Sequence, residues 1–199
     1  MKFTLHSSTL RPALVMFGAL TLVCGLLYPL AVTGLGRVLF PHQAAGSFIE
    51  RDGVLVGSRL IGQSFSSPKY FWGRPSATAP RANNGAASSG SNLGPNNPAQ
   101  IAAVKGRIDA LKAADPGNTQ PIPVDLVTAS ASGLDPDISV AAARYQSGRI
   151  AAARGLSVAR VNALVDQHSE TPLAGLLGEA RVNVLALNLA LDAETAHTR

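Results

Sequence analysis

The sequence predicts an α+β protein in which one N-terminal transmembrane helix precedes a small mixed α/β extracytoplasmic domain. Three observations support this class. An uncharged apolar run covers residues 13–35, a turn signal follows near residue 52, and apolar residues at helical spacing begin after residue 97. Two or three strands together with three or four helices are typical of an α+β domain.

The apolar run has the length of a membrane span. Its 23 residues, 13–35, extend roughly 34 Å as a helix, compared with about 30 Å of hydrocarbon core. A cleaved signal peptide is the alternative, but its apolar region is only about 7–15 residues long. We therefore expect a retained anchor. Gly18 and Gly25 give it a small face for another helix, and we expect Pro29 to kink it, although all three also fit ordinary transmembrane composition.

Charge predicts the orientation of this helix. Lys2 and Arg11 precede it and Arg37 follows it, so residues 1–12 are expected in the cytoplasm and residues 36–199 outside. The chain has a net charge of +5, of which +3 belongs to the part after the helix. Its basic residues are scattered singly, which argues against nucleic-acid binding. The lipid bilayer is the first expected partner.

Common catalytic and metal-binding patterns are not found in the sequence. The one cysteine, Cys24, lies in the apolar run, so the domain has no thiol for disulfides, catalysis or metal ligation. The four histidines have no ligand spacing, and neither a nucleophile elbow nor a phosphate loop is present. We expect no catalytic residue and no metal site.

The domain begins with a hairpin over residues 47–62, because Asp52-Gly53 stands between two apolar stretches. Residues 63–98 are rich in Gly, Pro, Ser and Asn. A flexible linker is one interpretation of this composition. We instead expect an ordered loop region, since the bulky residues at 70–72 favour burial and long ordered loops are usually functional.

Helical signals follow the loop region. Asn97-Pro98 is an N-cap with proline at the first helical position, and Ile101, Val104, Ile108 and Leu111 form one stripe. Residues 123–128 predict a strand.

A second helix is expected from Asp135-Pro136, as its cap, to Arg154, with Gly155 as the stop. Asp135 is interpreted as a cap rather than a catalytic acid. Ser157 begins a third helix, and residues 179–192 fit either a strand or, by length and composition, a helix.

Five strings occur in a fixed order behind the N-terminal helix. They are Gly-Gln-Ser-Phe at 62–65, Arg-Pro-Ser-Ala at 74–77, Ser-Asn-Leu-Gly-Pro at 91–95, Ser-Gly-Leu-Asp-Pro at 132–136 and Arg-Val-Asn-Val-Leu at 181–185. Together they resemble the C subunit of the Kdp-type high-affinity potassium-transporting P-type ATPase, from about residue 11 to residue 192. The family often has histidine where this chain has Asp137, which puts any role of that histidine in doubt here.

The resemblance implies a function and partners. It implies a non-catalytic accessory subunit of an ATP-driven potassium uptake pump in the bacterial inner membrane, supporting assembly and potassium affinity. Its partners would be a channel-like potassium-binding subunit, a P-type ATP-hydrolysing subunit and a small helical subunit. No cofactor is expected, although ATP enters through an alternative: a catalytic chaperone that raises the ATP affinity of the hydrolysing subunit, using amides of residues 89–94. A membrane-anchored extracytoplasmic hydrolase or solute-binding domain is the third hypothesis.

The expected interaction residues come from these strings and from the helices nearby. They either order the loops through internal hydrogen bonds, which we favour, or contact a ligand or partner directly. They are Gly62, Gln63, Ser64, Arg74, Pro75, Ser91, Asn92, Leu93, Gly94, Pro95, Asp135, Pro136, Gln146, Arg149, Arg181 and Asn183.

Overall fold

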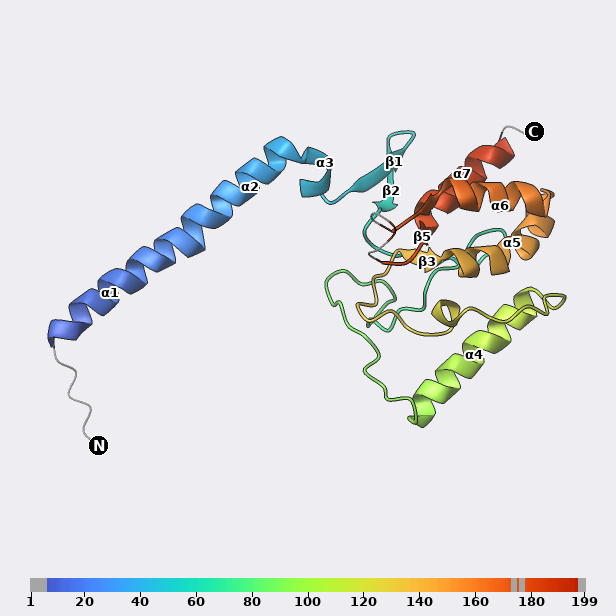
Figure 1. Ribbon diagram of the computed structural model, residues 1–199, viewed down its shortest axis with the longest axis horizontal. Helices are drawn as coiled ribbons and strands as arrows, with labels where there is room; N and C mark the ends of the chain where they lie inside the picture. The colour runs from blue at the N-terminus through green and yellow to red at the C-terminus, as the bar shows by residue number, and fades with distance from the viewer. Residues whose placement is uncertain (1–6, 173–174, 176–177, 197–199) are drawn as a thin grey trace. The chain divides into compact units, whose positions relative to one another are not determined.

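The computed structural model describes residues 7–172, 175 and 178–196, which form two compact units divided between Phe48 and Ile49 (Figure 1). The first unit contains the apolar helix, and the second contains the mixed helix and strand domain. The predicted α+β class with one long apolar N-terminal helix is confirmed.

The apolar helix is continuous and longer than the apolar run. It consists of α1 (Ser7–Leu22), a π-helical turn η1 (Val23–Leu27) and α2 (Tyr28–Leu39). The stretch Thr9–Leu39 has 31 residues, contains an 18-residue window with a mean hydropathy of 2.1, and has no buried side chains, so its length and composition suit a membrane span. Pro29 has no N–H for the carbonyl four residues earlier, and the π turn ends two residues before it, as expected where helical bonding is interrupted.

A short helix, α3 (Pro41–Ala44), follows this span. The chain then turns back on itself: the Ser47 N–H donates to the His42 carbonyl, and His42 Nε2 lies 3.2 Å from the Phe48 carbonyl oxygen.

The predicted hairpin is formed by β1 (Phe48–Arg51) and β2 (Val54–Ser58), and all of it except Phe48 belongs to the second unit. Asp52 and Gly53 have φ angles of 53° and 75°, as a tight hairpin turn with two left-handed residues requires. The second sheet has the antiparallel order β3-β5-β4, with β3 (Asp137–Ser139), β4 (Ser169–Glu170) and β5 (Arg181–Asn183). In its register, Ile138 faces Val182 and Ser169 also pairs with Val182.

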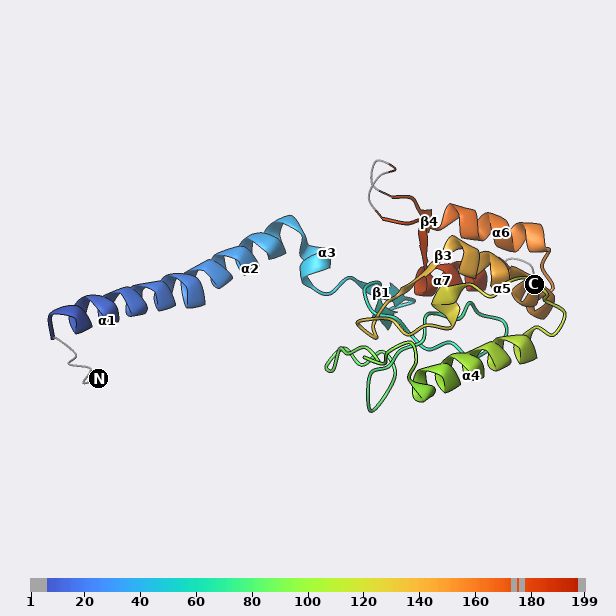
Figure 2. The ribbon, with the colours of Figure 1, turned by 60° about the horizontal axis from the view of Figure 1, so that its bottom comes forward.

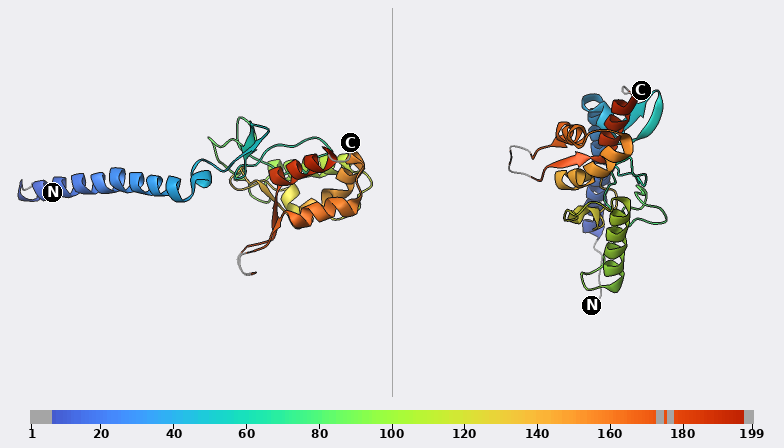
Figure 3. Two further views of the ribbon diagram at one scale, coloured as in Figure 1. Left: turned by 90° about the horizontal axis from the view of Figure 1, so that it is seen from above. Right: turned by 90° about the vertical axis from the view of Figure 1, so that its right-hand side faces the viewer.

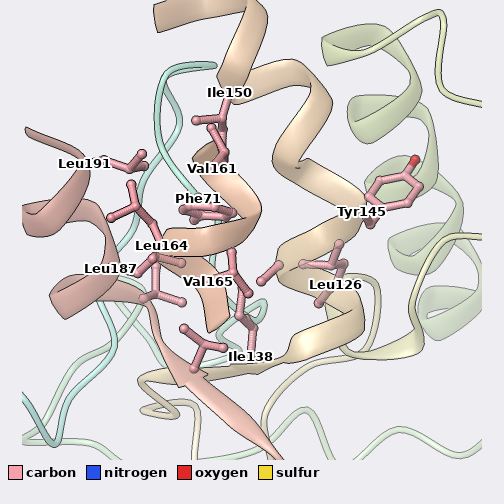
Figure 4. Close-up of a cluster of buried hydrophobic side chains, with 14 of the residues drawn as sticks. Phe71, Leu126, Ile138, Tyr145, Ile150, Val161, Leu164, Val165, Leu187 and Leu191 are labelled. Carbon is pink, nitrogen blue, oxygen red and sulfur yellow. The ribbon is translucent and has the colours of Figure 1, made fainter. Parts of the chain in front are cut away.

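Three helices pack with this sheet: α5 (Val140–Arg154), α6 (Val158–Gln167) and α7 (Val184–Ala196). α6 contacts both α5 and α7, and the strands run beside α5 and α7 (Figures 2 and 3). The side chains between them form the core drawn in Figure 4, where Ile150, Val161, Val165, Leu187 and Leu191 are all fully buried. The core is therefore made mainly from the C-terminal part of the chain.

The helix α4 (Pro98–Ala114) borders the loop region and reaches this cluster through Leu111, with Val104 and Ile108 packed against it (Figures 1 and 2). As predicted, Asn97 caps it by accepting a hydrogen bond from the Ala99 N–H, at 2.9 Å. Its apolar stripe is only partly used: Leu111 is buried and Ile101 is 57% exposed.

Residues 123–128 do not form the predicted strand. A 3-10 turn, η2 (Val124–Leu126), occupies this place, and the Thr128 hydroxyl donates to the Val124 carbonyl at 2.8 Å. The bend directs Leu126 into the core and lets the Asp125 carboxylate accept the Ser139 N–H at 2.8 Å. These contacts outweigh the strand preference of the local sequence, because such a preference is a property of packing and pairing.

The start of α5 was also predicted wrongly, since Asp135 does not cap it. The cap is Ser139, whose hydroxyl accepts the Ala142 N–H at 3.0 Å. Asp135 instead closes a turn by accepting the Asp137 N–H, and residues 137–139 pair as β3. Gly155 ends α5 with φ of 69°, and Ser157 caps α6, both as predicted.

Residues 179–192 contain both of the alternatives that the sequence left open. Arg181–Asn183 is a strand, and the helix begins at Val184, where the Asn183 side chain accepts the Ala186 N–H at 3.0 Å.

Candidate functional site

The loop region contains no helix or strand before Pro98, where α4 begins, and it is held by side chains of α5 and α7. Phe71, which is fully buried, is bracketed by Asn188: its N–H donates to Asn188 Oδ1 at 2.8 Å, and its carbonyl accepts from Asn188 Nδ2 at 3.0 Å. The Asn188 side-chain amide thus makes the two backbone hydrogen bonds that a neighbouring strand would make in a sheet. These two hydrogen bonds tie the backbone at the bulky residues 70–72 to α7.

Gln146 holds the next residue in the same way. The Trp72 N–H donates to Gln146 Oε1 at 2.8 Å, and Gln146 Nε2 donates to the Trp72 carbonyl at 3.1 Å. The same Nε2 also bonds the Ala142 carbonyl, and Oε1 accepts from Arg149 at 2.7 Å. Gln146 is 1% exposed and all its polar atoms are engaged, so its role in this structure is to order the loop.

Arg149 completes this network. It is 6% exposed and donates to the carbonyls of Pro68 at 2.5 Å and Tyr70 at 3.2 Å, with its guanidinium 4.6 Å from the centre of the Trp72 ring. Burial lowers the pKa of Arg149, with nearby Asp115 acting in the opposite direction. A buried guanidinium without a bonded carboxylate is stable here because carbonyl dipoles and a ring face surround it.

The Gly-Gln-Ser string joins the hairpin to the sheet. Gly62 donates its N–H to the Leu134 carbonyl at 2.8 Å, and a Cβ at this position would lie 2.6 Å from the Asp135 carbonyl oxygen. Gln63 Nε2 donates to the Val56 carbonyl at 2.8 Å, while the exposed Ser64 hydroxyl accepts from Asn83 at 3.3 Å. Gly62 is required at this contact, because a side chain would collide with backbone atoms.

Arg74 and Asp135, 61 residues apart in sequence, form an ion pair at 2.9 Å. On either side of this pair, the Pro75 carbonyl accepts from the Ser130 N–H at 2.9 Å and the Pro136 carbonyl accepts from the Val184 N–H at 3.0 Å. Three strings that are distant in sequence therefore meet at one place.

Arg181 and Asn183 meet Asp137 at the edge of the sheet. Asn183 Nδ2 donates to Asp137 Oδ1 at 3.0 Å and to the Arg59 carbonyl at 2.9 Å, and Arg181 Nε lies 3.1 Å from Asp137 Oδ2. Burial raises the pKa of Asp137, against the lowering effects of Asn183 and Arg181. The family's frequent histidine would here face a guanidinium, whereas Asp137 complements it.

The Ser-Asn-Leu-Gly-Pro string is not brought into these networks. Asn92 has a φ of 51°, Leu93 is 38% exposed, and Gly94 accepts the Asn97 N–H at 3.1 Å just before α4. Within the described residues, Ser91 and Asn92 make no side-chain hydrogen bond, and Pro95 is exposed. This string presents an open surface.

In the apolar helix, Gly18 has no atom near the position of a Cβ, and Gly25 has only a methyl group of its own helix at 4.0 Å. Pro29 lies two residues after the π turn. These positions form an open stretch of helix surface in this chain.

Some residues that hold the site were missed by sequence reasoning. Asn188 is 2% exposed, and its signal was its position as a polar residue within the apolar run of α7. Arg154, which pairs with Asp192 at 2.8 Å and lies 4.8 Å from the Tyr70 ring centre, left no comparable signal. Arg107, whose Nη1 donates to the Val127 carbonyl at 2.8 Å, was also missed. In the sequence it is one of several polar residues between the apolar positions of α4.

Two hollows flank the Arg74–Asp135 pair. One has a volume of about 210 Å³ and is lined by the loop region, α4 and η2; the other, of about 370 Å³, is lined by Asp125, Asp135, Asp137, Glu179 and Arg181 among others. No group of three His, Cys, Asp or Glu residues suited to a metal ion occurs in the part of the chain that the structure describes. The loop region is thus held by α5 and α7, and two hollows adjoin its Arg74–Asp135 pair.

Comparison with known proteins agrees with the resemblance of the five strings. The chain matches the family described as "KdpC: K+-transporting ATPase, c chain" over residues 10–193. It is 66% identical over 93% of its length to the potassium-transporting ATPase KdpC subunit of Herminiimonas arsenicoxydans, of which it covers 97%. The proteins of the same name from Variovorax paradoxus and Polaromonas naphthalenivorans are 65% and 68% identical, over 96% and 92% of this chain and 98% and 94% of theirs. The match includes the apolar helix, the braced loop and the sheet, and this chain therefore belongs to the KdpC family, the c chain of the K⁺-transporting ATPase.

Proposed function

We propose that this chain is the non-catalytic accessory subunit of an ATP-driven potassium uptake pump, supporting pump assembly and potassium affinity. The observation that carries the proposal is the family match over residues 10–193, which includes both the apolar helix and the domain. The relatives carry the name of a potassium-transporting ATPase subunit. ATP hydrolysis then belongs to another subunit of the same pump.

The apolar helix is the proposed docking element within the bacterial inner membrane. It would lie beside a channel-like potassium-binding subunit, with the P-type ATP-hydrolysing subunit and a small helical subunit completing the pump. Gly18 and Gly25, seven residues apart, leave helix backbone accessible to a neighbour. Close helix packing of this kind supplies the van der Waals contacts that replace the hydrophobic effect in lipid.

The domain is proposed to lie on the extracytoplasmic side. Lys2 and Arg11 precede the helix, and an excess of basic residues marks the cytoplasmic end of a span. Most motif side chains in the domain serve internal bonds: Gln146, Arg149 and Asn183 are all buried and bonded within the chain. This favours a rigid body that presents a surface to a partner over a reaction centre.

A catalytic chaperone that binds ATP is the alternative function. Its proposed phosphate site is the loop of residues 89–94. In this loop the Ser89 N–H is already in use, because it donates to the Ser132 carbonyl at 3.0 Å, and a Cβ at Gly90 would lie 2.8 Å from the Ala131 carbonyl oxygen. An extracytoplasmic domain would also have no access to cytoplasmic ATP. The location of the C-terminus therefore discriminates between the two functions.

The first test is a deletion. Removing residues 37–199 should weaken assembly of the pump or lower its apparent potassium affinity, measured by co-purification and by potassium-dependent ATP hydrolysis. A pump that assembles and responds to potassium normally after this deletion contradicts the proposal. Gly18→Leu with Gly25→Leu should impair co-purification, whereas the matched Gly34→Leu should not.

The second test is topology. A reporter fused after Arg199 should give an extracytoplasmic signal, as alkaline phosphatase does only when exported. A cytoplasmic signal would instead favour the ATP-binding alternative.

A further inference from the structure

The smaller hollow has the features of a binding site for an anion. Its volume is about 210 Å³, and it lies between residues 63–76 of the loop, α4 and η2. Two guanidinium groups, from Arg74 and Arg107, line it together with the apolar side chains of Phe65, Trp72 and Leu126. Pockets that enclose drug-sized ligands measure about 300–1,000 Å³, so this one suits a smaller molecule.

Both arginines retain unused capacity to bind an anion. Arg74 uses Nη1 for Asp135, but its buried Nε has no hydrogen-bond partner among the residues that the structure describes. Arg107 donates through Nη1 to the Val127 carbonyl at 2.8 Å and forms no ion pair within the described ranges. Burial lowers the pKa of Arg107, which reflects the cost of keeping this cation from water.

An unsatisfied buried donor is uncommon in folded proteins, and one in a native structure calls for a physical explanation. Here it belongs to Arg74, which lines this hollow as well as the second one, and the other cation of this hollow, Arg107, lacks an acidic partner in the described part of the chain. A negatively charged group in the hollow would give Arg107 an anionic partner and would lie beside the Arg74 guanidinium, because the planar guanidinium matches the two oxygens of a carboxylate.

We propose that this hollow binds a small organic carboxylate, with its oxygens toward Arg74 and Arg107 and its apolar body against Trp72 and Leu126. Inorganic phosphate would leave the apolar walls unfilled, and a nucleoside triphosphate exceeds the volume. The inference does not depend on the proposed pump role, since it rests on the hollow alone.

The chain supplies its own reporter, because Trp72 is the only tryptophan in the sequence. Full-length protein in detergent should show a saturable change in tryptophan emission on titration with benzoate, in the millimolar range. The neutral analogue benzamide has the same ring and size, and it should produce no saturable change. Phosphate should bind more weakly than benzoate, and ATP should bind no better than phosphate.

A matched pair of variants assigns the response to the hollow. Arg107→Gln removes the lining cation and should weaken benzoate binding at least about tenfold, as expected for losing one charged hydrogen bond. Lys105→Gln removes an exposed charge from the same helix, outside the hollow, and should leave binding unchanged. Thermal melting of both variants checks that they fold.

Several results would overturn the proposal. These are an equal response to benzoate and benzamide, no saturation with benzoate, equal losses in the two variants, or tighter binding of ATP than of benzoate. If Arg107→Gln fails to fold, the comparison of benzoate with benzamide on the unmodified protein still decides. A failure here leaves the deletion and reporter tests of the pump role unaffected.

Discussion

Replacing Asn188 by alanine tests whether the loop region is held by α7. This side chain is 2% exposed and makes two hydrogen bonds with the backbone of Phe71, at 2.8 and 3.0 Å. Truncation leaves a buried N–H and a buried carbonyl without partners, and each such loss costs about 1–3 kcal/mol. The free energy of unfolding should therefore fall by about 2–6 kcal/mol, out of a total of about 5–15 kcal/mol for an ordinary protein.

Thermal or urea unfolding of the full-length protein, followed by Trp72 emission, measures this loss because Trp72 adjoins Phe71 in the loop. A loss of 1 kcal/mol lowers Tm by about 2–4 °C in a protein of this size, so a decrease of about 4–24 °C is expected. Asn96→Ala, at an exposed loop position, is the matched control and should change stability by less than about 0.5 kcal/mol. If Asn188→Ala costs no more than Asn96→Ala, the reasoning that this amide braces the loop is refuted.

Three further predictions concern the same domain. Arg149→Met removes two bonds to loop carbonyls and the contact with the Trp72 ring, so we expect a loss of about 2–4 kcal/mol and a red shift of tryptophan emission; unchanged emission would contradict this. Gly133 and Gly155 share a φ of 69°, but only at Gly133 would a Cβ meet a side-chain atom, at 2.5 Å, and a carbonyl oxygen, at 2.6 Å. Gly155→Ala should cost about 1–2 kcal/mol from backbone strain alone, and Gly133→Ala clearly more; equal melting temperatures would show that the close packing is not rigid. Burial raises the pKa of Asp137 above its ordinary value of 3.8, so its contribution to stability is full below that value and falls as the pH rises through the raised pKa. Asp137→Asn should lack this fall in a comparison of unfolding across that pH window, and an identical pH slope in the variant would count against the assignment.

Several elements of this protein follow from short-range features of the sequence and need no tertiary contact to explain them. The apolar run predicts the long N-terminal helix, because an uncharged stretch of that length has no polar face that it could turn toward water. Asp52-Gly53 adopts the two left-handed conformations of a hairpin turn, and Asn97 and Ser157 cap their helices with their own side chains. Each of these outcomes depends on groups within a few residues of one another.

Where the sequence was misleading, a distant partner changed the local outcome. The side chain of Asp135 resembles a helix cap, but Arg74, 61 residues away, binds it, and Ser139 caps α5 instead. Residues 181–183 are a strand only because β3 and β4 supply partners, and the helix preference takes over at Val184. A strand of three residues is stable only through its pairing, which local sequence cannot reveal.

The family strings were visible in the sequence, whereas their meeting places were decided by the tertiary structure alone. Gln146 reaches Trp72 across 74 residues, and Asn188 reaches Phe71 across 117 residues. The hollow between Arg74 and Arg107 likewise exists only because α4 and the loop region fold onto the same core. Buried polar groups must find partners wherever the chain places them. The sequence by itself therefore determined the long apolar helix, the hairpin turn and the caps at Asn97 and Ser157, and the three-dimensional packing decided which polar side chains brace the loop.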